Sequence, residues 1–338
     1  MQKGCQPARR QSPAGGARCA APPVQSSARC TNTKLIVYMI TSSRYNHLDM
    51  HYNSQAAGAP AILISGAARG IGKSIATHLA SLGCTVFAGV RTAADGGTLR
   101  QLSPERITPV MLDVAQSDSI DAAMREIAAQ LGPGRGLQGL INNAGVYHGC
   151  PLQYFEVAEI RQIVEVNLLG TILLTRAALP LLRRGTGRVL MHGSAMGAMT
   201  APTIAVYGAT KAGMDALCEG LRLELALVGV PVILIEPGSV KSDLTAEGAQ
   251  KLARFLPRMT PDDRKTFEPV LRRIVELSDP SKGGLEPIEV AKAMAYALQC
   301  KRPRARYRVG LAAKMAALIG HLPDSWVDGI QRKVFRVG

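Results

Sequence analysis

The sequence predicts an α/β protein with a doubly wound, mainly parallel sheet flanked by helices. Strand-like and helix-like hydrophobic patterns alternate over most of residues 59 to 310, which favours one large α/β unit. Hydrophobic residues make up 47% of the chain but aromatic residues only 4%, which is typical of aliphatic packing between helices and a parallel sheet. The first strand-like run leads directly into a glycine-rich turn and an amphipathic helix.

Seven short apolar runs have the length of buried strands. They cover residues 61–65, 85–90, 107–112, 137–142, 187–193, 230–236 and 305–309. Helices are expected from the glycine turn to about Leu82, and over residues 117–131, 155–184, 205–228 and 287–299. Residues 239–284 interrupt this alternation and are rich in Lys, Arg, Glu and Pro, so we expect them to cover the sheet edge as a mobile lid.

The two ends of the chain carry most of its net charge of +15. Residues 1–58 hold seven Lys or Arg against one acid, and residues 301–338 hold nine against two. The body between them is nearly neutral, so nucleic acid is not the expected partner, whereas peripheral contact of the basic tail with a membrane surface stays open.

We expect residues 1–58 to be disordered, a targeting segment or a translated extension. Residues 59–310 are expected to form one domain, and residues 311–338 a helical tail.

The cysteine usage and the hydropathy of the sequence indicate in which cellular compartment the protein is expected. The seven cysteines show no CxxC or other metal-ligand spacing, so we expect no metal and a reducing compartment such as the cytoplasm. The Arg-rich, acid-poor front keeps an organellar transit peptide as the alternative. No apolar run of the sequence reaches membrane-spanning length.

The turn after the first strand has the features of a dinucleotide cradle. It contains Gly66, Gly70 and Gly72, a spacing that differs from the commoner GxGxxG. Glycines permit a tight turn and a close approach of the backbone to a ligand. The new helix offers free N–H groups and the positive end of its dipole to a pyrophosphate.

The ends of the second and third strands bear on which dinucleotide binds. Val90 stands where a carboxylate would bind the adenosine ribose, and Arg91 follows it. Together with Arg69, this favours the 2′-phosphate of NADP(H) over NAD(H), although both arginines could be ordinary surface charges. Asp113 either accepts the adenine amino group or caps the next helix.

A tyrosine and a lysine four residues apart, Tyr207 and Lys211, lie on one face of a predicted helix. A phenol normally titrates near pH 10, so proton transfer near neutrality requires a nearby cation, which Lys211 supplies. Ser194 follows the fifth strand, at the edge where open α/β sheets place their chemistry. Asn167 lies inside a long helix, where it is either merely tolerated or bends the helix to hold a water. The four residues predict an acid–base centre.

These motifs, in this order and at this spacing, resemble those of the classical short-chain dehydrogenase/reductase family over roughly residues 60–310. The matching pieces are Ser65 to Gly72, Asn142 to Gly145, Asn167, Ser194, Tyr207, Lys211, Pro237 and Gly238. Ser65 and Ser242 stand where the family usually has Thr, and both keep the hydroxyl. Residues 165–170, 236–238 and 306–310 are similar to the retinol and hydroxysteroid dehydrogenase branch.

The resemblance implies a Rossmann-type seven-stranded sheet, a homodimer or homotetramer, and a catalytic tetrad. In that tetrad Ser194 would hydrogen-bond the substrate oxygen and Tyr207 would exchange a proton with it. Lys211 would lower the phenol's pKa and hold the nicotinamide ribose, and Asn167 would position a water. The implied cofactor contacts are Ser65, Gly66, Arg69, Gly70, Ile71, Gly72, Arg91, Asp113, Val114, Asn143, Ala144, Gly145, Tyr207, Lys211, Pro237, Gly238, Val240 and Ser242.

The expected function is an oxidoreductase that interconverts an alcohol and a ketone or aldehyde on a largely hydrophobic small molecule, such as a steroid, retinoid or lipid. The first alternative is an NAD-dependent retinol or hydroxysteroid dehydrogenase. The second, from another class, is a cofactor-binding regulator without catalysis, although such a protein has no need to keep all four tetrad groups.

Overall fold

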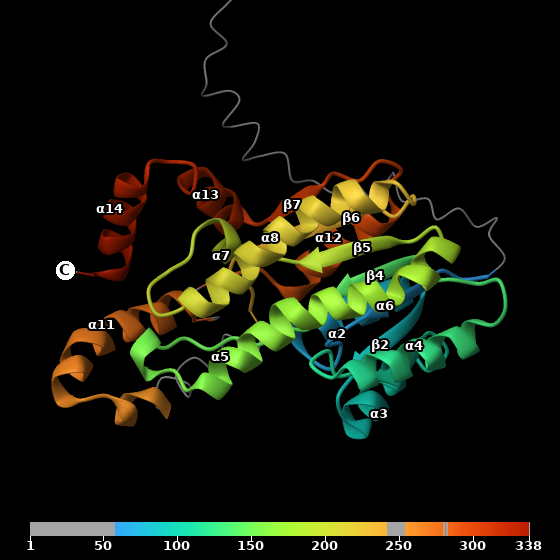
Figure 1. Cartoon of the computed structure of the whole chain (residues 1–338), viewed down its shortest axis with the longest axis horizontal. Helices are drawn as coiled ribbons and strands as arrows, with labels where there is room; N and C mark the ends of the chain where they lie inside the picture. The colour runs from blue at the N-terminus through green and yellow to red at the C-terminus, as the bar shows by residue number, and fades with distance from the viewer. Residues whose placement is uncertain (1–57, 242–253, 280, 282, 338) are drawn as a thin grey trace, which may run out of the picture. The chain divides into compact units, whose positions relative to one another are not determined.

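The computed structural model describes residues 58–241, 254–279, 281 and 283–337, all of which belong to one compact unit. At its centre is a parallel sheet of seven strands in the order β3-β2-β1-β4-β5-β6-β7 (Figure 1). The strands are β1 Ala61–Ile64, β2 Thr85–Val90, β3 Ile107–Met111, β4 Gly139–Asn142, β5 Arg188–His192, β6 Val232–Pro237 and β7 Arg306–Val309. The predicted doubly wound sheet is confirmed, whereas the expectation for residues 1–57 lies outside the described residues.

Both faces of the sheet are buried, because the strands are apolar at successive positions rather than alternating. Ile62 and Ile64 of β1 face one layer, which contains α2 (Gly70–Ser81) and α12 (Pro287–Gln299). Ala61 and Leu63 face the other layer. That layer is formed by α4 (Ser117–Leu131), α6 (Gly170–Arg184) and α8 (Ala205–Ala226).

Two helical features were not predicted. Helix α3 (Ala93–Leu102) contains a Gly-Gly pair that lowers its intrinsic propensity, but Thr92 caps it by accepting from the Asp95 N–H at 3.1 Å. The single long helix expected over residues 155–184 consists of three parts. These are α5 (Val157–Val164), the π-helical turn η3 (Glu165–Leu169) and α6.

The predicted lid includes residues 242–253, which lie outside the described residues, but its second half contains ordered helix. The 3-10 turn η4 (Leu256–Arg258) leads into α11 (Pro261–Ser278). Phe255, Leu256, Met259 and Leu271 form a small apolar cluster with Cys150, which lies in the loop after β4. The hydroxyl of Tyr154 donates to the Asp263 carboxylate at 2.6 Å. The second half of the segment is therefore anchored to the loop between β4 and α5.

The tail after β7 is helical, as its apolar spacing predicts. It forms α13 (Leu311–Ile319) and α14 (Asp324–Phe335). Ala313 and Ala316 of α13 pack on Ala195 of the short helix α7 (Ala195–Ala198). Helix α14 lies beside α11, where the Arg273 guanidinium donates to the Val334 carbonyl at 3.1 Å.

One expectation about hydropathy is wrong. The helical run Val157–Arg184 has 28 residues and contains an 18-residue window with a mean hydropathy of 1.4, which is enough by length and composition to cross a membrane. Ile163, Leu174 and Leu182 of this run are buried inside the fold. Since a core helix of a soluble protein passes the same test, the run is only weak support for a membrane span.

Gly72 marks the tightest packing in the glycine turn. A Cβ at this position would lie 2.1 Å from the Gly66 carbonyl oxygen and 2.6 Å from the Asn143 side-chain nitrogen. Gly72→Ala is therefore expected to lower the free energy of unfolding by about 1–3 kcal/mol in urea titrations. Gly97→Ala is the control, because no atom lies within 4 Å of a Cβ there and helix propensity raises stability by up to about 1 kcal/mol. Equal effects of the two changes would contradict the packing argument.

Candidate active site

The order of strands reverses between β1 and β4, which is where open α/β sheets bind ligands. At this point the Ser65 hydroxyl accepts from the backbone N–H groups of Asn143 and Ala144, both at 3.0 Å. The Asn143 side chain donates in return to the carbonyls of Ser65 at 3.0 Å and Gly66 at 2.9 Å. The amide therefore ties the ends of β1 and β4 together.

The glycine turn has the shape that a pyrophosphate needs. Gly66 and Gly70 have φ angles of 64° and 54°, in the left-handed region that favours glycine. A Cβ on Gly66 would lie 2.8 Å from the Ala144 Cα. Helix α2 begins after Arg69 without a side-chain cap, so its first N–H groups remain available to an anion. These residues fit the phosphates of a dinucleotide.

His192, at the end of β5, links this turn to the centre of the site. Its Nδ1 lies 2.9 Å from the Asn143 Oδ1. Both N–H bonds of that amide already go to carbonyls, so Oδ1 must accept and Nδ1 must carry the proton. Burial, and secondly the charge of Lys211, lower the pKa of His192 to about 3. The imidazole is therefore neutral at pH 7, and its backbone carbonyl accepts from the Lys211 Nζ at 2.7 Å.

Asn167 lies in the π-helical turn η3 and is fully buried. Its Oδ1 accepts from the Val146 N–H at 2.8 Å, and its Nδ2 donates to the Val146 carbonyl at 2.9 Å. The same Nδ2 lies 3.3 Å from the Thr210 hydroxyl on α8. The π-helical turn agrees with the predicted distortion of the helix. The side-chain amide holds the loop after β4 against α8.

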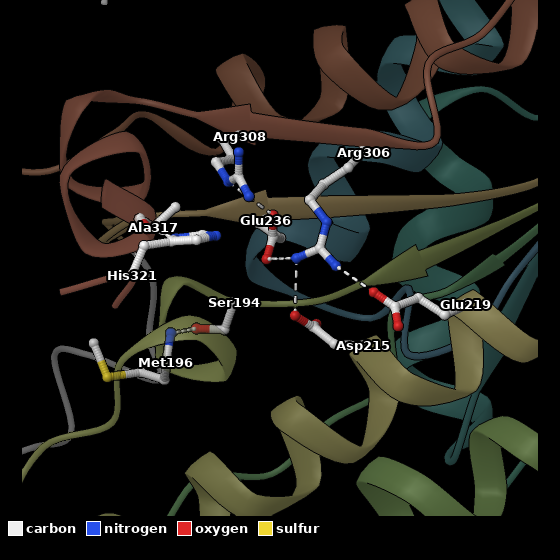
Figure 2. A network of polar contacts seen from close by, with 9 residues as sticks. All are labelled: Ser194, Met196, Asp215, Glu219, Glu236, Arg306, Arg308, Ala317 and His321. Atoms are coloured by element: carbon white, nitrogen blue, oxygen red, sulfur yellow. Dashed lines mark hydrogen bonds and ion pairs between the residues drawn. The ribbon is translucent and has the colours of Figure 1, made fainter. Parts of the chain in front are cut away.

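Ser194 and Tyr207 are brought together by two different elements. Ser194 follows β5 and caps α7, where its hydroxyl accepts from the Met196 N–H at 3.2 Å (Figure 2). Tyr207 lies in the first turn of α8, and the Ser194 hydroxyl is near enough to its phenol to lower the phenol's pKa. The Lys211 Nζ lies 5.7 Å from the centre of the Tyr207 ring. A second phenol, Tyr147, meets that ring edge-on with centroids 5.2 Å apart.

The electrostatics differ from the prediction that Lys211 lowers the pKa of Tyr207. Burial raises the pKa of Tyr207, and the nearby Ser194 hydroxyl opposes that rise. Burial also lowers the pKa of Lys211 to about 8, while the Asp215 carboxylate raises it. Because desolvation acts on both groups and Lys211 is directed at the His192 carbonyl, the ammonium does not offset the burial of the phenol.

The remaining predicted cofactor residues lie at the ends of β2, β3 and β6. Arg91 is exposed, whereas Val90 before it is buried. Asp113 does not cap α4, whose N-cap is Gln116; its carboxylate accepts from the Ala115 N–H at 3.0 Å.

Other residues predicted to contact a cofactor lie in close packing contacts between elements of the fold. Val114 packs against Gly170, and Gly238 lies against Ala312 of α13. Val240 is buried and forms a bridge to Leu285, while Ser242 lies outside the described residues.

Sequence reasoning missed His192, Tyr147 and Asp215. Asp215 carried a signal, because it lies four residues after Lys211 and therefore on the same helix face. His192 stands two residues before Ser194, so the same strand end carries both. Nothing local distinguishes Tyr147 from other loop tyrosines. Within the described ranges, no group of three or more His, Cys, Asp or Glu side chains could hold a metal ion.

Known proteins resemble this chain in sequence and in fold. The short chain dehydrogenase family matches residues 60–253. The mitochondrial D-beta-hydroxybutyrate dehydrogenase of Bos taurus is 34% identical over 74% of this chain and 76% of its own. The NADPH-dependent 3-dehydrocapnine reductase of Ornithobacterium rhinotracheale is 31% identical, covering 79% of this chain and 94% of its own. Retinol dehydrogenase 7 of Mus musculus is 30% identical, covering 80% and 86%.

The fold has a close match among solved structures. A short-chain dehydrogenase from Streptomyces avermitilis superposes with a TM-score of 0.66 at 26% identity, covering 82% of this chain and 96% of that one. The family match extends over more than half of the 338 residues. The chain therefore belongs to the short chain dehydrogenase family, whose members are oxidoreductases that act on alcohols with NAD(P).

Proposed function

We propose that this protein interconverts an alcohol and a ketone or aldehyde, with Tyr207 as the general acid or base. The observation that carries the proposal is the convergence of the Ser194 hydroxyl, the Tyr207 phenol and the buried Lys211, whose Nζ lies 5.7 Å from the centre of the phenol ring. A regulator that only binds a cofactor would not need a serine, a tyrosine and a lysine converging at one sheet edge. The nicotinamide cofactor would supply or accept the hydride.

Each residue's chemistry follows from its surroundings. The Ser194 hydroxyl would hydrogen-bond the substrate oxygen, and Tyr207 would give that oxygen a proton during reduction. Because burial raises the pKa of Tyr207, the phenol keeps its proton near neutral pH. This favours reduction near pH 7 and oxidation under alkaline conditions. Lys211 would contact the nicotinamide ribose, and Asn167 would hold the loop after β4 and support a proton-relay water.

Replacing Tyr207 with phenylalanine tests the mechanism. Tyr207→Phe should lower kcat about 100- to 10,000-fold, since it removes the proton donor and little volume. Cofactor affinity, measured by isothermal titration calorimetry, should stay within about threefold of wild type. Tyr296→Phe on α12 is the matched control and should leave kcat unchanged. A Tyr207→Phe enzyme within about tenfold of wild type would sink the proposed mechanism.

NADP(H) is the cofactor that the second strand favours. At its end Val90 offers no carboxylate to repel a 2′-phosphate, and the exposed Arg91 follows. The similar reductase of Ornithobacterium rhinotracheale is named NADPH-dependent, which supports this preference. Since Val90 is buried, an aspartate there would place a charge in the core. Arg91 is therefore the better residue to change.

Arg91→Ala should raise the KM for NADPH about tenfold, because it removes a charge-assisted hydrogen bond to the 2′-phosphate. The KM for NADH should change less than about twofold, since NADH carries no such phosphate. Arg100→Ala, at an exposed position in the last turn of α3, is the control and should affect neither cofactor. Equal loss for both cofactors, or tighter binding of NADH by the wild type, would reject the preference.

The surroundings of Ser194 and Tyr207 favour a largely apolar substrate. Tyr147 covers one edge of the Tyr207 ring, and α13 packs its alanines on the helix that Ser194 begins. The name of retinol dehydrogenase 7 specifies an apolar substrate, whereas the name of D-beta-hydroxybutyrate dehydrogenase specifies a small hydroxy acid. The choice between them rests on the apolar contacts of this site.

A substrate panel measured with both NADPH and NADH decides this point. We expect reduction of at least one steroid ketone, retinoid or fatty aldehyde, with kcat/KM at least about tenfold above that for sugars and short keto acids. A preference for a short keto acid would overturn the apolar assignment. The oxidoreductase assignment would stand in that case.

Assembly and location are proposed on similar grounds. Exposed apolar side chains on the α5–η3–α6 run and on α8 would be covered in a homodimer or homotetramer: Val164, Leu169, Ile172, Leu223 and Leu227. The cysteine usage favours the cytoplasm. The bovine relative is named mitochondrial, and this supports the organellar alternative. The exposed Trp326 and basic residues of α14 are consistent with peripheral membrane contact.

A further inference from the structure

Behind the proposed catalytic lysine lies a group of charged side chains that the reaction does not use directly. Asp215 is on α8, one helical turn beyond Lys211. Its Oδ2 accepts from the Arg306 guanidinium of β7 at 2.9 Å, and the same guanidinium nitrogen lies 2.8 Å from Glu236 Oε1 (Figure 2). Arg306 therefore bridges α8 to the end of β6 through two carboxylates.

The members of this network differ sharply in burial. The side chain of Glu236 is 2% exposed and that of Asp215 is 16% exposed. Glu219, a third carboxylate on α8, lies 3.7 Å from Arg306 but is 62% exposed. Burial raises the pKa of Asp215 and Glu236, and the nearby arginine opposes this in both cases. Removing one partner would leave a buried charge uncompensated, so the buried members are strongly coupled.

One oxygen of Asp215 lies next to α7. Its Oδ1 is buried and has no hydrogen-bond partner among the described residues. A Cβ added to Gly197 of α7 would lie 3.2 Å from that oxygen and 3.1 Å from the Lys211 carbonyl. Asp215 thus lies directly behind the short helix that Ser194 begins, where a glycine gives it room.

The charged and titratable groups around Lys211 come from several elements. Helix α8 contributes Tyr207 and Asp215, β5 contributes the neutral His192, and α7 contributes none. Glu236 of β6 and the two arginines of β7, Arg306 and Arg308, lie behind Asp215. Burial lowers the pKa of Lys211 to about 8, and the Asp215 carboxylate is the charge that raises it. Without this carboxylate the lysine would lose its proton at a lower pH.

We propose that Asp215, which lies one turn beyond Lys211 on the same face of α8 and is held there by Arg306, is a positioning residue that keeps the buried Lys211 charged at neutral pH. This rests on the proposed function only in giving Lys211 a catalytic role. The carboxylate acts through space, because Lys211 donates its hydrogen bond to the His192 carbonyl. Arg306 keeps Asp215 ionised and fixes α8 against the end of β6.

The direct test is an NMR titration of Lys211 in protein labelled with ¹³C at the lysine ε-carbon. Lys211→Arg identifies the resonance. Asp215→Asn is expected to lower the Lys211 pKa by about one pH unit, since a nearby charge is removed from a poorly solvated site. Asp215→Glu, which keeps the charge, should restore the wild-type value within about 0.3 units. Glu219→Gln is the matched control on the same helix with the same arginine partner, and should leave the value unchanged.

The titration needs neither cofactor nor substrate, so its result is independent of whether Tyr207→Phe supports the proposed reaction. An unchanged Lys211 pKa in Asp215→Asn, or an equal shift in Glu219→Gln, would overturn the proposal. If Asp215→Asn lacks a cooperative thermal transition, Asp215→Ser replaces it with the same expected shift. In the active enzyme, the alkaline limb of kcat should move to lower pH by the same amount in Asp215→Asn alone, whereas a merely structural loss would lower kcat at every pH.

Discussion

The polar ties between the ends of β1 and β4 are the contacts on which the rest of the site depends. A parallel sheet leaves backbone N–H and carbonyl groups unsatisfied where its strands end, and here the Ser65 hydroxyl and the Asn143 amide satisfy them. The same amide orients His192, whose carbonyl holds Lys211. One set of hydrogen bonds therefore connects the glycine turn to the proposed acid–base centre.

Burial sets the electrostatic character of this centre. It keeps the imidazole of His192 neutral, raises the pKa of Tyr207 and lowers that of Lys211. An isolated pair of phenol and ammonium would behave differently in water, where desolvation contributes nothing. The charges that counter this burial come from the next layer, where Asp215 and Arg306 join α8 to the far strands of the sheet.

Segments late in the chain pack against the residues that follow β5 and β6. Helix α13 contacts α7 directly, and α11 is anchored to the loop after β4 by its apolar cluster and by the bond from Tyr154 to Asp263. Helix α14 lies beside α11, so the tail and the second half of the lid segment share contacts. The helix that Ser194 begins and the loop after β4 are thus both contacted by elements that lie far away in sequence.

The sequence by itself determined the doubly wound parallel sheet and the glycine turn, because continuous apolar runs and glycines specify local structure. It also placed Ser194 at the sheet edge and Tyr207 and Lys211 on one helix face, since the carboxyl ends of parallel strands and the spacing on a helix are regular. That the three residues converge was implied only by the resemblance to the family. It missed α3, whose Gly-Gly pair lowers helix propensity, and α11, whose helix rests on packing against Cys150 and its neighbours. Only the tertiary structure decided the direction of the Tyr207 pKa and the partners of Asp215, because desolvation and ion pairing depend on side chains that the fold brings together from distant elements.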